Sequence, residues 1–183
     1  MRCVVLLRGI NVNGHRMVPM ADLRRLLADL GYTAVQTYIQ SGNVVCAPPP
    51  GADPATDIRE AIARRFGYDD VGVVVLSAGE MAEIAAGNPF LSQGADPRQL
   101  YVTVLSAPSP PERAAALAAV QALSDRCAMA RRWIYVHCPG GYHRTTLSNA
   151  FFERAAGVTA TTRNWQTTLR LAEWVRPGAD GGE

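Results

Sequence analysis

The segment RCVVLLRG, residues 2–9, places four consecutive aliphatic side chains between two arginines. An apolar run of this length that ends at a glycine predicts a buried β-strand closed by Gly9. A polar loop follows over residues 10–18. Leucines then recur at helical spacing over residues 19–30, and Gly31 ends the helix that they predict. The chain is therefore expected to begin with a strand and a helix.

The next segments complete a known order of elements. Residues 33–39 and 43–46 are rich in β-branched and aliphatic side chains, and the Gln-Ser-Gly turn between them predicts a hairpin. An Asp-Pro pair at residues 53–54 is typical of a helix start, and residues 71–76 form an almost purely aliphatic strand. The resulting order, βαββαβ, is that of the ferredoxin-like fold.

The second half of the chain is predicted to repeat most of this order. Ser-x-x-Glu capping boxes at Ser77 and Ser109 predict two helix starts. Three strands, of which the first precedes the Ser109 helix, and then two helices are expected at residues 100–105, 127–130, 133–137, 145–156 and 163–175. The second half is thus predicted to be a degenerate copy with the core order βαββαα, in which a helix replaces the final strand.

These elements predict an α+β protein made of two plait-like, ferredoxin-like subdomains. The first is expected over residues 1–76 and the second, degenerate one over residues 77–176. Residues 177–183, PGADGGE, lack the apolar side chains of a core and are expected to form a disordered tail.

The composition excludes several classes of function. Among 183 residues there are 18 arginines and no lysine, and with 16 acidic residues the formal net charge is only +2. A charge this balanced does not predict a polybasic nucleic-acid-binding protein. The absence of lysine excludes Schiff-base chemistry, a lysine general base and a Walker-type phosphate loop.

No targeting or membrane segment is expected. The amino terminus has only the short apolar run of residues 4–7, which is much shorter than the core of a secretory signal. The longest uncharged stretch, residues 31–52, contains polar residues and prolines and does not resemble a membrane span. We therefore expect a cytoplasmic protein without a membrane partner.

The cysteines and histidines form no recognisable metal or redox motif. The four cysteines, at positions 3, 46, 127 and 138, show no C-x-x-C spacing, and the three histidines show no H-x-H or H-E-x-x-H spacing. We expect no metal and no cofactor, and we expect the cysteines to be buried as small hydrophobic residues. These patterns identify no catalytic residue.

Six segments occur in order along nearly the whole chain: LLRGINVNG (6–14), VPMADLRRLL (18–27), TYIQSGNVV (37–45), NPF (88–90), GYHRTTLSNAFFER (141–154) and TTRNWQT (161–167). Together they resemble the bacterial family known as domain of unknown function sixteen ninety-seven. The resemblance implies a compact α+β protein of two plait-like subdomains and implies no established activity. Two positions depart from the family pattern: Asn13 stands where the family usually has a second glycine, and Thr146 stands where it often has lysine.

The first candidate site lies in the loop after the first strand. Arg8, Asn11, Asn13 and His15 follow the carboxyl end of that strand and precede a helix. This is a common ligand position, because backbone amides at a helix N-terminus attract anions. The alternative is that Arg8 and Asn11 bond the loop backbone and hold the two subdomains together.

The second candidate site lies at the tip of the predicted hairpin, where Ser41 and Asn43 are polar. Turn chemistry explains these residue types, because asparagine and serine are common in tight turns. A ligand role becomes relevant if this tip faces the first loop.

Two further candidate segments lie in the second half. Two glycines precede His143, Arg144 and Thr145, and glycines, a guanidinium and a threonine before a helix suit either an oxyanion pocket or an ordinary capped turn. Arg163 and Asn164 are expected at the start of the last helix, where a cation opposes the helix dipole unless an acid or a bound anion offsets it.

We therefore expect the protein to bind a phosphorylated or other anionic ligand in a cleft lined by the first loop, the Gly140–Arg144 turn and the Thr161–Asn164 helix start. The alternative is an enzyme that acts on a small anionic substrate with His15 or His143 as proton carrier. Nucleic acid is a weaker version of the binding hypothesis, because no RNP-like aromatic motif is present. A third hypothesis places the polar segments at the rim of an interface between copies of the chain, whose number the sequence does not fix.

Overall fold

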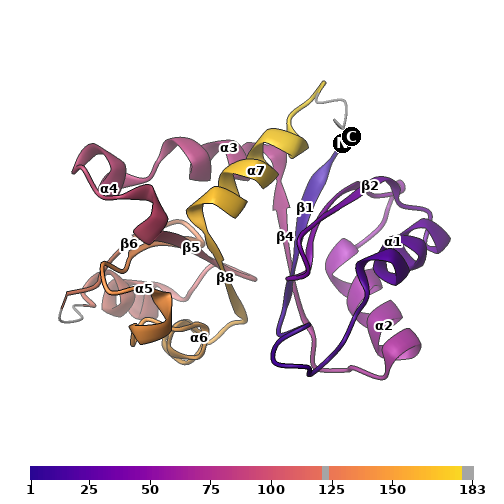
Figure 1. Ribbon diagram of the computed structural model, residues 1–183, viewed down its shortest axis with the longest axis horizontal. Coiled ribbons are helices and arrows are strands. Elements are labelled where there is room, and N and C mark those ends of the chain that lie inside the picture. The colour runs from indigo at the N-terminus through magenta and orange to yellow at the C-terminus, as the bar shows by residue number, and fades with distance from the viewer. Residues whose placement is uncertain (121–123, 179–183) are drawn as a thin grey trace. The chain divides into compact units, whose positions relative to one another are not determined.

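The computed structural model describes residues 1–120 and 124–178, and the chain divides into two compact units (Figure 1). The first unit combines Met1–Ala82 with Arg170–Glu183, and the second is Glu83–Leu169. The carboxyl-terminal segment thus groups with the first unit, and both boundaries between the units fall inside helices. Of the expected tail, the first two residues form a turn, and residues 179–183 lie outside the described part.

The first unit contains a four-stranded antiparallel sheet in the order β2-β3-β1-β4. Its strands are β1 (Cys3–Arg8), β2 (Thr33–Tyr38), β3 (Asn43–Ala47) and β4 (Gly72–Ser77). Helices α1 (Met20–Asp29) and α2 (Pro54–Phe66) lie against one face of this sheet (Figure 1). Every element of the predicted βαββαβ order is therefore present close to its expected position.

The core of the first unit lies between the sheet and these two helices. Val5 and Leu7, which alternate along β1, belong to one buried cluster with Leu23 of α1 and Ile62 of α2. Burial of this apolar surface is the main favourable contribution to folding. The side chain of Asp53 caps the first turn of α2, as the Asp-Pro pair predicts.

The carboxyl-terminal segment contributes to the first unit through Trp174. Its ring packs edge-on against Tyr38 of β2, with the ring centroids 5.6 Å apart. Its carbonyl oxygen accepts a hydrogen bond from the Arg2 guanidinium at 3.2 Å. Residues from both ends of the chain therefore stabilise the same unit.

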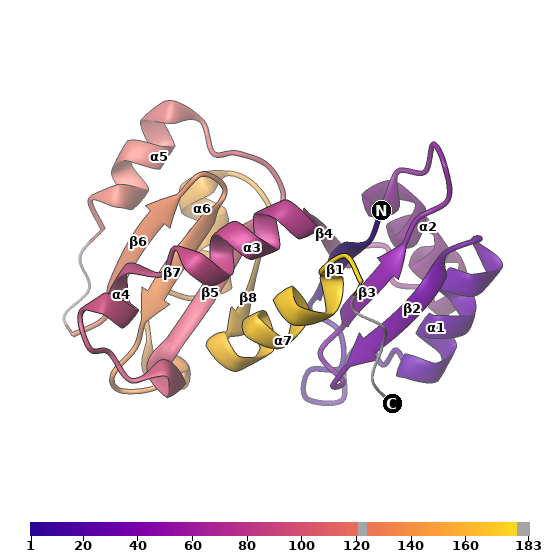
Figure 2. The same cartoon turned by 90° about the horizontal axis from the view of Figure 1, so that it is seen from above.

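The second unit contains a sheet of the same topology, with the order β6-β7-β5-β8 (Figure 2). Its strands are β5 (Leu100–Leu105), β6 (Arg126–Ala130), β7 (Trp133–His137) and β8 (Ala160–Asn164). Helices α5 (Pro111–Ala118) and α6 (Asn149–Ala156) follow β5 and β7 in the chain, as α1 and α2 follow β1 and β3. The expected α+β architecture of two ferredoxin-like subdomains is confirmed.

One element of the second unit contradicts the prediction: residues 160–164 form strand β8 and do not start the last helix. This strand pairs with β5 along its whole length, with Asn164 opposite Tyr101. The last helix, α7 (Trp165–Val175), begins directly after it. Threonines and an asparagine before a helical repeat are typical of a cap, but β-branched threonines also suit a strand, and pairing with β5 decides between the two. The second unit thus has the full βαββαβ order, and the predicted βαββαα core is wrong.

The remaining short elements are α3 (Ala78–Ala86), α4 (Pro89–Ser92), η1 (Pro97–Gln99) and η2 (Tyr142–Arg144). The capping box before α3 is confirmed, because the Ser77 hydroxyl accepts from the Glu80 N–H at 3.1 Å and the Glu80 carboxylate accepts from the Ser77 N–H at 2.9 Å. The second predicted box is wrong: α5 has no side-chain cap, and the Ser109 hydroxyl instead donates to the Ala156 carbonyl at 3.4 Å. The Asn88 side chain caps α4 by accepting from the Phe90 N–H at 3.1 Å.

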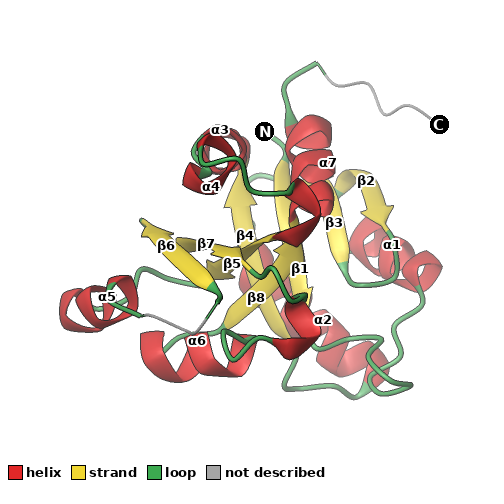
Figure 3. Ribbon diagram, turned by 60° about the vertical axis from the view of Figure 1, so that its left-hand side comes forward, coloured by secondary structure: helices red, strands yellow, loops and turns green. Residues whose placement is uncertain are grey.

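Helices cover both faces of the second sheet (Figure 3). Ile134 and Val136 of β7 belong to one buried cluster with Phe152 of α6, on the side where α5 also lies. The alternate residues of β7 face the opposite side, where the Tyr135 hydroxyl donates to the Ile84 carbonyl of α3 at 3.1 Å. This double coverage explains why every residue of β7 is buried.

Candidate functional site

In the first unit, the side chain of Asn11 joins the loop after β1 to the tip of the β2–β3 hairpin. Its amide nitrogen donates to the carbonyl oxygens of Val18 at 2.9 Å and Gln40 at 2.7 Å, and its amide oxygen accepts from the Val18 N–H at 2.8 Å. Asn11 has a left-handed backbone with φ 53°, which asparagine tolerates better than most residues. The hairpin tip therefore faces the first loop, which is the arrangement that makes Ser41 and Asn43 relevant to it.

The other side chains of this loop differ in their exposure. Arg16 forms an ion pair with Asp70, and this contact holds the pKa of the Asp70 carboxyl below its usual range. The backbone is held as well, since the His15 N–H donates to the Val12 carbonyl at 2.9 Å. Asn13 and His15 have side chains exposed to solvent. The loop is thus fixed by its own contacts and presents these two polar side chains.

The remaining candidates of the first unit lie at the end of β1 and in the hairpin. Arg8 is half-buried, and alternation along the paired strands β1 and β3 puts it on the same face of the sheet as the buried Asn43. The Asn43 amide donates to the Tyr38 carbonyl at 3.0 Å and to the Ser41 hydroxyl at 2.9 Å, which closes the hairpin turn. These are structural contacts, and a ligand role for Arg8, Ser41 and Asn43 stays a prediction.

In the second unit, the Gly140–Arg144 turn and strand β8 come together. Tyr142, in η2, packs against Tyr101 of β5 with ring centroids 4.8 Å apart, and it approaches Thr162 of β8. Burial raises the pKa of the Tyr142 phenol, and the contact with Thr162 partly offsets this rise. Two of the three segments expected to line a ligand site are therefore neighbours within this unit.

The candidate side chains of the turn differ from their predicted roles. Thr145 does not cap a helix: its hydroxyl accepts from the Leu147 N–H at 3.0 Å, and α6 begins later, after the Ser148 cap. His143 and Arg144 are exposed. Among the described residues the Arg144 guanidinium has no ion-pair partner, so its charge is available to a ligand.

Arg163 lies within β8, so the predicted conflict with a helix dipole does not arise. Its guanidinium donates to the Thr161 hydroxyl at 2.8 Å and to the Thr162 carbonyl at 2.9 Å. Burial lowers the pKa of Arg163 to about 10, which leaves the side chain charged at neutral pH. The second unit thus carries a cation inside strand β8 as well as the exposed cation of the turn.

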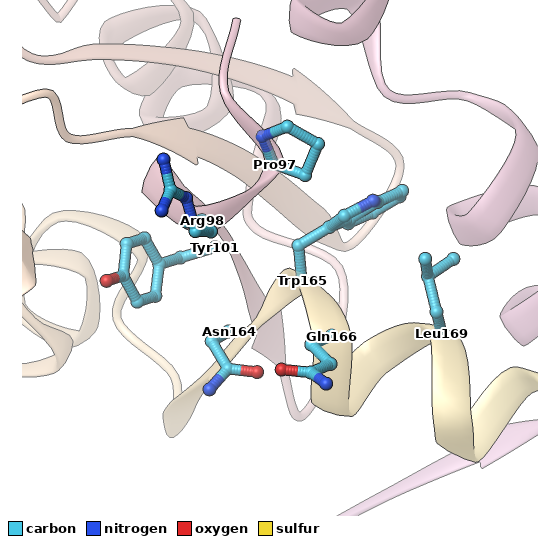
Figure 4. Close-up of a pocket in the computed structure, with 7 residues that line it drawn as sticks. All are labelled: Pro97, Arg98, Tyr101, Asn164, Trp165, Gln166 and Leu169. Carbon is cyan, nitrogen blue, oxygen red and sulfur yellow. The ribbon is translucent and has the colours of Figure 1, made fainter.

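A pocket of about 490 Å³ lies where β8 passes into α7 (Figure 4). Its lining residues come from η1, β5 and the β8–α7 junction and are Pro97, Arg98, Tyr101, Asn164, Trp165, Gln166 and Leu169. This volume lies in the range of small-molecule sites, which combine apolar walls with a few polar groups. The pocket adjoins the Gly140–Arg144 turn, because the Tyr101 ring also contacts Tyr142.

Three polar side chains of this pocket can bind a ligand. The Asn164 amide oxygen accepts from the Thr167 N–H at 2.7 Å and so caps α7, while its amide nitrogen has no partner among the described residues. The exposed Gln166 side chain has none in the described part either. Arg98 is exposed and donates to the Asp96 carboxylate, with the closest contact at 2.8 Å, which lowers the pKa of Asp96. The pocket is therefore lined by several side chains with N–H donors together with apolar side chains.

Asn164 is the only lining residue that is also a sequence candidate. Trp165 is buried, with an exposed fraction of 3%, although its ring borders the pocket. Tyr101 and Gln166 carry no local signal of a site. The signal that could have located the pocket is a strand that runs directly into a helix, and it becomes visible only when residues 160–164 are assigned to a strand.

A separate buried group in the second unit surrounds His137. Its Nδ1 lies 3.1 Å from Nη2 of Arg126, and its Nε2 lies 3.2 Å from Oε1 of Gln99. Because a guanidinium can only donate, these partners assign the proton of a neutral imidazole to Nε2. Burial and the Arg126 charge lower the pKa of His137. Both ring nitrogens are therefore engaged in structural contacts.

The described residues provide no group of three or more histidine, cysteine or acidic side chains that could hold a metal ion. Cys3, Cys46 and Cys138 are buried and Cys127 is half-buried, and all four are free thiols. Within residues 1–120 and 124–178, no helix has the length and apolarity needed to cross a bilayer.

Comparisons with known proteins give a family and a fold. A family model described as "Protein of unknown function (DUF1697)" matches residues 1–135 and confirms the resemblance seen in the sequence. None of the curated proteins compared matches the chain. Among solved structures, the conserved bacterial protein SP0830 from Streptococcus pneumoniae is similar, with a TM-score of 0.75 and 22% identity over 96% of this chain and 98% of that chain. At this identity the likeness shows the fold alone.

Proposed function

Because the chain belongs to the family of proteins of unknown function DUF1697, we propose a function from its own geometry: it binds a small phosphorylated or otherwise anionic molecule in the second unit. The observation that carries this proposal is the pocket of about 490 Å³ at the β8–α7 junction. Its position at the end of a strand and the start of a helix is a common ligand position in α/β and α+β folds.

The charges and donors around the pocket support an anionic ligand. The Asn164 amide nitrogen, the Gln166 amide and the Arg98 guanidinium supply N–H donors, and the first turn of α7 adds the positive end of a helix dipole. Arg144 stands on the adjoining turn with no ion-pair partner among the described residues. Arginine binds phosphate and carboxylate groups bidentately, so a lysine is not needed.

The enzyme alternative has less support from the contacts. The side chains of His15 and His143 have no hydrogen bond to a carboxylate or a nucleophile within the described residues, and a general base needs such a partner or a bound substrate. The first-loop candidates Asn11, Asn13 and His15 stay a prediction, and the proposed binding in the second unit does not depend on them.

A thermal-shift panel tests the proposal. Nucleotides, sugar phosphates, dicarboxylates and short oligonucleotides are compared at equal ionic strength, because a ligand that binds the folded protein raises its melting temperature. A ligand at about one hundred times its Kd adds about 2.7 kcal/mol, and for a chain of this size we expect a rise of roughly 5–10 °C. If no anion raises the melting temperature, the proposal is wrong.

Charge variants locate the site. Gln166→Glu places a negative charge in the pocket and should abolish the shift, and Arg144→Ala should reduce it. Ala116→Glu adds the same charge on the exposed side of α5 and should leave the shift unchanged. Equal shifts in wild type and Gln166→Glu would place the ligand elsewhere.

A further inference from the structure

Three ring side chains from separate elements bound the pocket at the β8–α7 junction (Figure 4). Pro97 belongs to η1, Tyr101 to β5 and Trp165 to the start of α7. Because β5 and β8 are paired with Tyr101 opposite Asn164, the sheet itself sets the Tyr101 ring beside the Asn164 amide. The pairing of β5 with β8 therefore places the aromatic ring of Tyr101 next to the carboxamide of Asn164.

These rings are already held before any ligand binds. The Tyr101 ring rests on Tyr142 at 4.8 Å between centroids, with an interplanar angle of 35°. The Trp165 indole is buried and packs against Tyr135 at 6.5 Å. A wall whose side chains are already ordered loses little conformational entropy when a second flat ring packs on it.

The two carboxamides of the pocket complement the edge of a flat heterocycle. Asn164 has a fixed orientation, because its oxygen caps the Thr167 N–H and its nitrogen is left to donate. Gln166, two residues later and beside it in Figure 4, can offer either amide atom. Asparagine and glutamine amides pair with the donor and acceptor edges of nucleobases, and aromatic side chains stack on their faces.

Arg98 supplies the charge on the Tyr101 side of the pocket. The Asp96 carboxylate accepts from its Nε and Nη2 atoms, which lie 3.1 and 2.8 Å from Oδ2, whereas Nη1 makes no hydrogen bond to this carboxylate. A guanidinium has five N–H donors, so one that binds a carboxylate through Nε and Nη2 can still donate to a second anion through Nη1. A single anionic group attached to a ring fits this arrangement.

We infer that the anionic ligand carries a flat heteroaromatic ring, as a nucleoside monophosphate does. The ring packs on Tyr101, its edge meets Asn164 and Gln166, and the anionic group lies toward Arg98. This inference rests on the proposed function and narrows it to one class of ligand.

The experiment titrates the full-length protein with nucleoside monophosphates and with ribose 5-phosphate, and follows both the melting temperature and tryptophan fluorescence. Trp165 borders the pocket, so a ring that packs on Tyr101 inside the pocket should change the fluorescence emission of Trp165. We expect the best nucleotide to bind at least tenfold more tightly than ribose 5-phosphate, because stacking on an aromatic side chain accounts for a factor of roughly ten per base.

Three variants, at two positions, assign the contacts. Tyr101→Leu should weaken nucleotide binding about tenfold, whereas Tyr101→Phe, which keeps the ring, should stay within about threefold of wild type. Gln166→Ala is an exposed change that leaves the fold intact and should weaken nucleotide binding about fivefold, and ribose 5-phosphate binding by less than that.

Two results overturn the inference in distinguishable ways. If ribose 5-phosphate binds as tightly as every nucleotide, the ring is not recognised, and the proposed anion binding still stands. If neither the nucleotides nor any other anion of the panel binds, the proposed function fails together with the inference.

Discussion

In both units the last strand of the sheet runs directly into a helix, but the caps of these two helices differ. In the first unit β4 runs directly into α3, and Ser77 and Glu80 satisfy each other in a reciprocal capping box. In the second unit β8 runs directly into α7, and Asn164 caps the helix with its oxygen alone. A closed box has no group left for a ligand, whereas a carboxamide cap keeps two N–H donors. The same topology thus gives a purely structural junction in one copy and a candidate site in the other.

The polar residues near the first loop show the same contrast. Asn11 and Asn43 have amides bonded to the backbone of neighbouring segments. Gln166 in the second unit has an exposed amide with no hydrogen bond to the described residues. Polar residues in a family motif can therefore maintain a fold in one unit while similar residues line a pocket in the other.

The largest loss of stability is expected from Gly42→Ala, which tests how tightly the hairpin tip packs against Leu7 and Ile10 within the first unit. Gly42 has φ +75°, and a Cβ there would lie 2.7 Å from the Leu7 Cβ and 2.8 Å from the Ile10 Cδ1. Overpacking together with the left-handed backbone should lower the free energy of unfolding by about 3 kcal/mol. Gly14→Ala is the control, since Gly14 has φ +77° and open space around it, and it should cost about 1 kcal/mol. Urea denaturation measures both, and equal losses would show that packing at Gly42 is unimportant.

A smaller loss of stability is expected from Asn11→Ala. If the variant is as stable as wild type, the contrast between the bonded amides of the first unit and the available amide of Gln166 does not hold. The variant removes two hydrogen bonds with Val18 within the first loop and one with Gln40 of the hairpin, and it should lower the free energy of unfolding by about 2 kcal/mol. Gln166→Ala should change it by less than about 0.5 kcal/mol. Similar losses in the two variants would mean that the pocket amide is also structural.

The junctions themselves are compared by removing each cap. Ser77→Ala and Asn164→Ala should each lower the free energy of unfolding by about 1 kcal/mol. Asn164→Asp keeps the capping oxygen and removes the amide donors, so it should retain wild-type stability within about 0.5 kcal/mol and lose the ligand-induced thermal shift. An Asn164→Asp protein that still binds the anion would remove the functional difference between the two junctions.

The smallest effect is expected from His137, a polar group of the second unit that has partners on both ring nitrogens. Its pKa is lowered from the ordinary value of 6.5, so the unfolded chain binds a proton more readily than the folded one. The free energy of unfolding should therefore fall as the pH decreases below 6.5 and stop falling below the lowered pKa. His137→Gln should show a shallower decline in urea denaturation between about pH 7 and about pH 5. Parallel declines in the two proteins would contradict this.

The first unit could be predicted from the sequence because its signals are redundant. The aliphatic run of β1, the glycines after α1 and α2, and the Asp53 cap all indicate the same elements. Strand β8 could not, because its sequence Ala-Thr-Thr-Arg-Asn has no aliphatic alternation and its stability comes from pairing with β5, far away in the chain. Local patterns there indicate a helix cap, and only the tertiary partner indicates a strand.

The candidate site was predictable in part for a related reason. Glycines and polar residues marked the Gly140–Arg144 turn and the Asn164 segment, and the structure brings these two together. Tyr101 and Arg98 were missed, because they enter the pocket through the pairing of β5 with β8 and not through any motif of their own. The amides of the first loop were recognised as special, but their partners, such as the Gln40 carbonyl, are visible only in the folded chain.

The return of the carboxyl-terminal segment to the first unit sets an order of events during synthesis. Residues 83–169 are continuous in the chain, so the second unit can complete its contacts as soon as it leaves the ribosome. Tyr38 and Arg2 emerge much earlier, but their partner Trp174 is made only after the whole second unit. The first unit, although its sheet is translated before the second unit, therefore completes its contacts after it.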